Sequence, residues 1–155
     1  MQIAQGKMGR VAAFRLAPGE DILEGMEKAC GELKINNGLI LSGIGSLDGA
    51  TFFDPVILPE KKSKYGYGNP LVLYGPIELV SMSGMICQND ADGKTLFHIH
   101  FALTDQYGNA HGGHLMEGNK VLLTVDLMIA EVEGIKMGRR FDNDLGVFLF
   151  NPSQK

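Results

Sequence analysis

The sequence predicts an α/β (α+β) fold in which one main helix packs on a mostly antiparallel β-sheet. Apolar residues recur at three- and four-residue intervals in residues 20–33, which is typical of an amphipathic helix. The rest of the chain consists largely of short apolar runs separated by glycine-containing turns, which favours strands joined by hairpins. The 155 residues contain no repeat, linker or shift in composition. We therefore expect one domain over residues 9–150, with terminal tails at 1–8 and 151–155.

The first strand is expected at residues 11–16, and Pro18-Gly19 then turns the chain into the helix. The apolar face of this helix consists of Ile22, Leu23, Met26, Ala29, Cys30 and Leu33. Glu20 and Asp21 fall in its first turn, where negative charge interacts favourably with the helix dipole. Asn36-Asn37-Gly38 tolerates positive φ, so we expect the helix to end there.

Strands separated by turns follow the helix. They are expected at residues 39–44, 50–53, 77–87, 95–104, 121–132 and 147–150, with turns at 45–49, 89–93 and 105–109. The segment 121–132 also fits a helix by periodicity alone. Residues 59–70 are polar and rich in Lys, Gly and Tyr, which predicts a loop. In that loop, Tyr65 and Tyr67 are either mobile at the surface or able to stack on a ligand.

The composition favours a soluble, cytoplasmic protein. The formal net charge is −4, which opposes broad binding to nucleic acid because such binding depends on neutralising phosphates. The two cysteines, Cys30 and Cys87, lack CxxC spacing and are expected to be buried free thiols in a reducing compartment. The chain has no signal-peptide pattern and no apolar run of the roughly 18 residues that a membrane helix needs. A local basic patch remains open at residues 61–64 and at Arg139-Arg140.

All four histidines lie between residues 98 and 114. Side chains alternate between the two faces of a strand, so His98 and His100 point the same way, about 6.6 Å apart along the strand. The turn at 105–109 then returns the chain antiparallel to this strand, which can bring His114 or His111 beside the pair. Three imidazoles around one divalent ion leave a coordination position open, as in catalytic or ligand-exchanging sites. The alternative is that these histidines only form hydrogen bonds at a surface or an interface.

Several neighbours of this cluster are candidates to support or line the site. A metal-bound imidazole usually donates its other N–H to a carboxylate or carbonyl, and the candidate carboxylates are Glu78, Asp105, Glu117 and Asp126. Gly113, with Gly112, lets the backbone pass close to a ligand or a neighbouring chain. His111 is the weaker ligand candidate, and its alternative interpretation is a solvent-exposed histidine. Asp126 is expected to face solvent, because a lone carboxylate is costly to bury.

Four blocks of residues occur in order along residues 9–150. They are Arg15-Leu16 with Pro18-Gly19-Glu20-Asp21-Ile22, Ser42-Gly43-Ile44-Gly45-Ser46-Leu47, Gly75-Pro76-Ile77-Glu78-Leu79-Val80 with Gly84, and His98-Ile99-His100 with Gly108 and Gly112-Gly113-His114-Leu115. In their order and spacing these blocks resemble the PPC family, the plant and prokaryote conserved domain also called DUF296. The chain looks like a prokaryotic single-domain member without an AT-hook.

This resemblance implies a compact PPC-like domain that assembles as a homotrimer. It also implies a metal ion at His98, His100 and His114, near a subunit boundary. The family is described as DNA-binding because plant members carry a separate AT-hook, whereas this chain has no Arg-Gly-Arg-Pro hook. Pro76 replaces the arginine of the plant hexapeptide. Glu78 matches that hexapeptide, which leaves a role near the metal or in trimer contacts open.

Three functions are compatible with these residues. The first is a homotrimeric, metal-binding regulatory protein with a protein or small-molecule partner. The second is a metal-dependent enzyme acting on a small molecule, with Glu78 or Glu117 as general base. The third is sequence-specific DNA binding through the trimer surface. The expected cofactor is a divalent ion, zinc first, with nickel, iron and copper as alternatives because imidazole suits them all. A cupin fold also places HxH on a strand, but Thr104-Asp105 stands where the cupin glutamate would follow.

Overall fold

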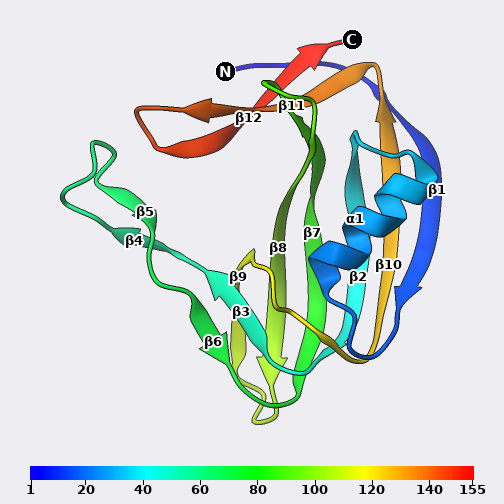
Figure 1. The fold of residues 1–155 in the computed structure, drawn as a ribbon, viewed down its shortest axis with the longest axis vertical. Helices are drawn as coiled ribbons and strands as arrows, with labels where there is room; N and C mark the ends of the chain where they lie inside the picture. The colour runs from blue at the N-terminus through cyan, green and yellow to red at the C-terminus, as the bar shows by residue number, and fades with distance from the viewer.

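The fold is built on long antiparallel strands with a single helix lying across one face (Figure 1). In the computed structural model, which describes residues 1–155, the main sheet has ten strands. Eight of them follow the order β1-β10-β2-β7-β8-β9-β3-β6, and β11, which pairs with β7, adds β12 outside this path. The elements are β1 (Lys7–Leu16), α1 (Ile22–Leu33), β2 (Gly38–Leu47), β3 (Ala50–Phe53), β4 (Pro55–Ile57), β5 (Tyr65–Tyr67), β6 (Leu71–Leu73), β7 (Ile77–Asn89), β8 (Thr95–Asp105), β9 (Ala110–Leu115), β10 (Val121–Glu133), β11 (Ile135–Asp142) and β12 (Val147–Gln154). The predicted class, a mostly antiparallel sheet with one helix, is confirmed.

β10 is the segment whose periodicity also fitted a helix, and it is an interior strand of the sheet. It pairs antiparallel with β1 on one side and with β2 on the other. Val125, Leu127 and Ile129 are buried at every second position, while Asp126 and Met128 between them are exposed. Alternation with a period of two is the pattern of a half-buried strand, and its β-branched residues pack well on a pleated surface.

α1 covers one face of the sheet and buries Ile22, Met26 and Cys30 in the main core. The helix begins later than expected, because Asp21 is its N-cap rather than a residue of the first turn. The Asp21 carboxylate accepts hydrogen bonds from the backbone N–H groups of Leu23 and Glu24, at 2.8 and 3.3 Å. This contact satisfies two of the donors that a helix N-terminus leaves free.

The helix also ends earlier than the predicted stop at residues 36–38. Lys34 adopts a left-handed conformation with φ 55°, and its N–H bonds back to the last turn. Asn37 was expected to cap the helix, but its side chain serves another element. It donates to the carbonyls of Val132 and Ile135 and accepts from the N–H of Met137, which fixes the turn between β10 and β11.

Two hairpins depart from the sequence-based expectations. The predicted loop at 59–70 contains β5, which pairs with β4 to form a separate two-stranded ribbon. β11 was not predicted, and β12 extends beyond the expected 147–150 because it pairs with β11 along its whole length, from Asp142↔Val147 to Ile135↔Gln154. β2 likewise runs to Leu47, into the segment 45–49 that was expected to be a turn. In Figure 1 the β4–β5 and β11–β12 hairpins project to the same side of the sheet.

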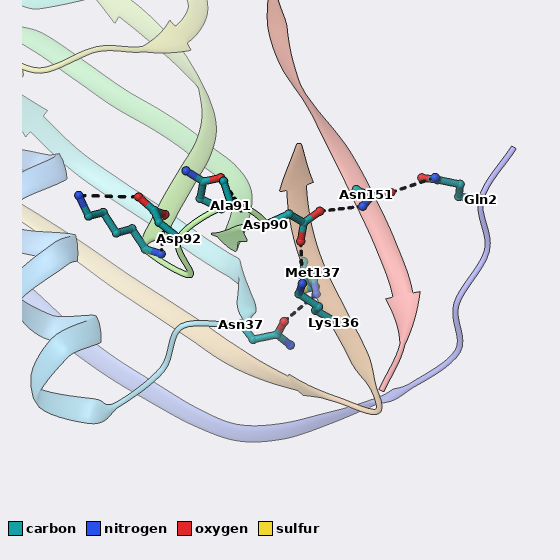
Figure 2. A network of polar contacts seen from close by, with 10 residues as sticks. Gln2, Asn37, Asp90, Ala91, Asp92, Lys136, Met137 and Asn151 are labelled. Carbon is teal, nitrogen blue, oxygen red and sulfur yellow. Dashed lines mark hydrogen bonds and ion pairs between the residues drawn. The ribbon is translucent and has the colours of Figure 1, made fainter. Parts of the chain in front are cut away.

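A polar network fastens the β11–β12 hairpin to the end of β7 (Figure 2). The Asp90 carboxylate accepts from Lys136 Nζ and from Asn151 Nδ2, each at 2.7 Å, and Asn151 in turn accepts from Gln2 at 2.9 Å. The hydrogen bond from Lys136, followed by that from Asn151, lowers the pKa of Asp90. Gly138 leaves room for this carboxylate, because a Cβ there would lie 2.4 Å from Asp90 Oδ1.

The two cysteines are buried free thiols, as predicted. Burial raises the pKa of both Cys30 and Cys87 to about 11, so each is protonated at neutral pH. The single helix has 12 residues, which is too short to span a bilayer.

Candidate metal centre

Three of the four histidines converge on the sheet face opposite α1. His98 and His100 come from β8 and His114 comes from β9, with His100 directly opposite His114 in the antiparallel pair. One ring nitrogen from each residue can be chosen so that all three lie within 4.8 Å of one another. The ring centroids are 5.1 Å apart for His98–His100, and 5.4 Å apart for each pair that includes His114.

The strand geometry explains why these side chains meet. Ile99 and Phe101 are 1% and 4% exposed and point into the core, so the alternating residues His98 and His100 point outwards. β9 pairs antiparallel with β8 and is flanked by β3 on its other side. Gly113 permits that flanking contact, because a Cβ there would lie 2.6 Å from Asp54 Oδ1 and 2.7 Å from the Phe53 carbonyl. The close approach predicted for Gly113 is therefore to a neighbouring strand.

Burial and nearby charges favour the neutral forms of His98 and His114. Burial is the main factor that lowers the pKa of His98 to about 4, and the charges of Arg139, His100 and His114 lower it further. Burial, then His100 and Arg139, also lower the pKa of His114. Neutral imidazole is the form that binds a metal ion.

Two ring nitrogens in the cluster are buried without a hydrogen-bond partner, namely Nδ1 of His98 and Nδ1 of His114. A buried polar atom without a partner costs about 1–3 kcal/mol, so such atoms usually have a hydrogen-bond partner. Coordination of a divalent cation would satisfy them. The three residues therefore fit a metal ion both in their donor type and in their geometry.

An aromatic stack holds the imidazole of His114 from the β5 side. The ring of Tyr67 stacks on His114 at 5.2 Å with an interplanar angle of 29°. Phe53 in turn stacks on Tyr67, with ring centroids 5.6 Å apart and an interplanar angle of 26°. The sequence predicted that Tyr67 lies in a loop, with stacking on a ligand as one alternative. In the structure Tyr67 belongs to β5 and stacks on a histidine of the cluster.

The remaining predicted site residues lie outside the cluster. His111 is three positions from His114 on β9 and hydrogen-bonds Asp105 across 3.2 Å. Glu78 is exposed on β7 opposite Thr104, and Glu117 is exposed after β9. Thus no carboxylate belongs to the group of side chains that could jointly hold an ion.

A cavity of about 580 Å³ opens beside the histidines. Its lining includes His98, His114, Tyr67 and Arg139. Its apolar walls come mainly from the β11–β12 hairpin, through Phe141, Leu145, Val147, Phe148 and Leu149. Arg139 was recognised from the sequence only as half of a basic pair. In a strand, Arg139 and Arg140 must point to opposite faces, and Arg139 is indeed half-buried while Arg140 is exposed.

Comparisons with known proteins agree with the fold. The model of the Plants and Prokaryotes Conserved (PCC) domain matches residues 3–133. A solved structure of a plant- and prokaryote-conserved protein from Pyrococcus horikoshii is 28% identical, covers 100% of both chains and has a TM-score of 0.80. A metal-containing protein from Archaeoglobus fulgidus is also 28% identical, with 97% of this chain and 99% of that chain covered and a TM-score of 0.80.

A longer protein also matches. The bifunctional protein GlmU of Synechococcus sp. strain JA-3-3Ab is 29% identical over 137 residues, which is 88% of this chain. The match covers only 20% of that protein, so the chain spans about a fifth of the length of this relative.

Proposed function

Because the chain belongs to the Plants and Prokaryotes Conserved (PCC) domain family, we propose that it is a regulatory protein built around one divalent metal ion. The ion is held by His98, His100 and His114. The observation that carries this proposal is that ring nitrogens of all three residues lie within 4.8 Å of one another. The similar Archaeoglobus fulgidus protein, which is described as metal-containing, supports it.

Zinc is the first candidate for this ion. Three imidazole nitrogens are a common ligand set for zinc, although nickel, iron and copper also accept imidazole. When bound, such an ion acts as a Lewis acid toward whatever ligand takes its open coordination position. The protein contributes three imidazoles, the Tyr67 ring that stacks on His114, and a cavity that leads to the site.

Elemental analysis of the purified protein tests this proposal. We expect about one equivalent of metal per chain in the wild type, and a clear loss in each of His98→Ala, His100→Ala and His114→Ala. His111→Ala is the matched control, because His111 lies outside the cluster and hydrogen-bonds Asp105. If the control lost as much metal as the three variants, the ligand assignment would be wrong.

The assembly that fits this protein is a homotrimer. Apolar residues are exposed on neighbouring strands of the face that also carries His100. They are Val11 of β1, Met128 of β10, Leu41 and Ile44 of β2, and Val80 of β7, each between 41% and 51% exposed. A second copy of the chain would remove these side chains from water, which is favourable at about 25 cal/mol per Å².

A metal-dependent enzyme acting on a small molecule is the second candidate. The observation that favours it is the cavity beside His98 and His114, whose volume is in the range of about 300–1,000 Å³ that small-molecule sites occupy. Assays of the zinc-loaded protein with ester, lactone and phosphate libraries test it. Turnover that disappears in His100→Ala would establish the activity, and equal rates in both proteins would refute it.

A further inference from the structure

Arg139 is a half-buried cation without an acidic partner. Its Nη2 donates to the backbone carbonyl of Phe148, but its Nε is buried and has no hydrogen-bond partner. Some other basic residues are paired, as Arg10 is with Glu131 and Lys136 is with Asp90, and the other basic residues that lack an ion pair are exposed. Burial of an unpaired charge is costly, so a guanidinium in this position is suited to an anion that arrives from outside.

The guanidinium is placed where such an anion would also reach the histidines. Arg139 lines the cavity together with His98 and His114. Metal-binding histidines and one unpaired arginine therefore line the same cavity.

The position of Arg139 is fixed by the rest of the fold. β11 pairs in parallel with the end of β7 at Arg139↔Asn89, which ties the arginine backbone to the main sheet. Next to it, Gly138 packs against Asp90, whose carboxylate binds Lys136 and Asn151 (Figure 2). The backbone that carries Arg139 is thus attached to both neighbouring strands rather than to a free loop.

We propose that this cavity binds a small organic monocarboxylate with an apolar body. The inference rests on the proposed metal site. The carboxylate lies between Arg139 and the ion held by the three histidines, and the apolar body lies against the β11–β12 hairpin. Arginine is suited to a carboxylate because its planar guanidinium can donate two parallel hydrogen bonds.

The lining of the cavity selects this ligand class. Arg139 is the one charged side chain in the lining, so a ligand with a single anionic end and an otherwise apolar body matches this cavity. Much of the remaining wall is apolar or aromatic, with Phe141, Leu145, Phe148 and Leu149 on one side and Tyr65 and Tyr67 on the other. An apolar or aromatic body would displace water from these walls.

Isothermal titration calorimetry with 4-phenylbutyrate as the probe tests the inference. We expect the zinc-loaded wild type to bind 4-phenylbutyrate at least tenfold more tightly than 4-phenylbutyramide, which has the same body without the charge. Arg139→Gln should weaken carboxylate binding at least tenfold while the zinc content stays unchanged. Arg140→Gln, which alters the exposed neighbour, is the matched control and should bind as the wild type does.

The outcomes separate this inference from the proposed function. If zinc is present in the wild type but the carboxylate and the amide bind equally, or if inorganic phosphate binds more tightly than 4-phenylbutyrate, the inference is overturned and the metal site stands. If Arg139→Gln binds the carboxylate as tightly as the wild type, the inference is likewise overturned. If the wild type holds no metal, the proposed function fails, and the bridging position of the carboxylate fails with it. The comparison of acid and amide uses only wild-type protein, so it remains decisive even if Arg139→Gln does not fold.

Discussion

His100 on β8 and His114 on β9 are directly opposite each other in an antiparallel pair, and their ring centroids are 5.4 Å apart. The site therefore depends on the register of two strands. A slip of one residue would send His114 to the opposite face of the sheet, because the side-chain period of a strand is two. Residues that fix this register are as important to the site as the ligands themselves.

Gly113→Ala tests the packing that holds β9 in this register. The added methyl group would lie 2.6 Å from Asp54 Oδ1 and 2.7 Å from the Phe53 carbonyl, so β3 would have to move. We expect the free energy of unfolding to fall by about 1–3 kcal/mol, the range for overpacking, and the zinc affinity to fall with it. Chemical denaturation and a competitive zinc titration measure the two effects.

The matched control for that variant is Gly31→Ala in α1. A methyl group there meets no atom within 4 Å, and alanine favours a helix over glycine by up to about 1 kcal/mol. Gly31→Ala should therefore be neutral or stabilising. Equal destabilisation by the two substitutions would mean that crowding against β3 is not the cause.

Removal of the Asp90 carboxylate should loosen the hairpin that carries Arg139. In Asp90→Asn the ion pair with Lys136 is lost, and we expect faster hydrogen exchange of the β11 amides, with little change in β8. Asp92→Asn is the control, because the Asp92–Lys94 pair spans 3.7 Å within a single turn. Unchanged exchange in β11 would contradict a role for Asp90 in anchoring the hairpin.

The metal-free protein should lose stability on acidification through His98. Its pKa in the folded state is about 4, below the value of 6.5 for an unperturbed imidazole. Between these values the unfolded chain binds the proton and the folded chain does not, so the free energy of unfolding falls as the pH drops from about 6.5 towards 4. Urea denaturation of the metal-free protein at several pH values measures this slope, and His98→Gln should reduce it. An identical slope in His98→Gln would exclude His98 as its source.

A charge on the exposed sheet face should break the proposed trimer without unfolding the chain. Val80 is 49% exposed on β7, and Val80→Glu would place a carboxylate among the apolar side chains of that face. Size-exclusion chromatography with light scattering should give a trimer for the wild type and a monomer for Val80→Glu. Tyr107→Glu, at an exposed turn, should remain a trimer. A monomeric wild type at micromolar concentrations would contradict the assembly.

DNA binding can be tested independently of the metal site. The formal net charge of −4 opposes contacts with phosphates, and we expect no mobility shift of duplex DNA at about 10 µM protein and physiological salt. A shift under these conditions that disappears at higher salt would point to a basic surface that the net charge conceals.

Local patterns predicted the central parts of this fold and of the site. The period of two around Ile99 set His98 and His100 on one face, and the turn at 105–109 returned the chain so that His114 or His111 could lie beside them. In the structure it is His114 that is opposite His100. His111 could not be excluded in the same way, since the exact length of the turn decides which of the two histidines reaches the outer face. Its pairing with Asp105 became evident only from the structure.

The rest depends on contacts between distant segments. β5 has three residues and its pairing with β4 leaves almost no periodic signal, so Tyr67 was not placed beside His114. β11 joins the sheet by a parallel contact with β7, which no local pattern encodes. Because β11 was not predicted, Arg139 appeared as part of a surface pair and not as one of two side chains on opposite faces of a strand.

X-ray absorption spectroscopy at the zinc edge of the zinc-loaded protein tests the central claim most directly. We predict three imidazole nitrogens at about 2.0–2.1 Å, with one further light ligand and no sulfur. The spectrum of His114→Ala should lose one imidazole contribution. A sulfur shell at about 2.3 Å, or a spectrum unchanged by His114→Ala, would show that the ion binds elsewhere and that His98, His100 and His114 do not form the metal centre.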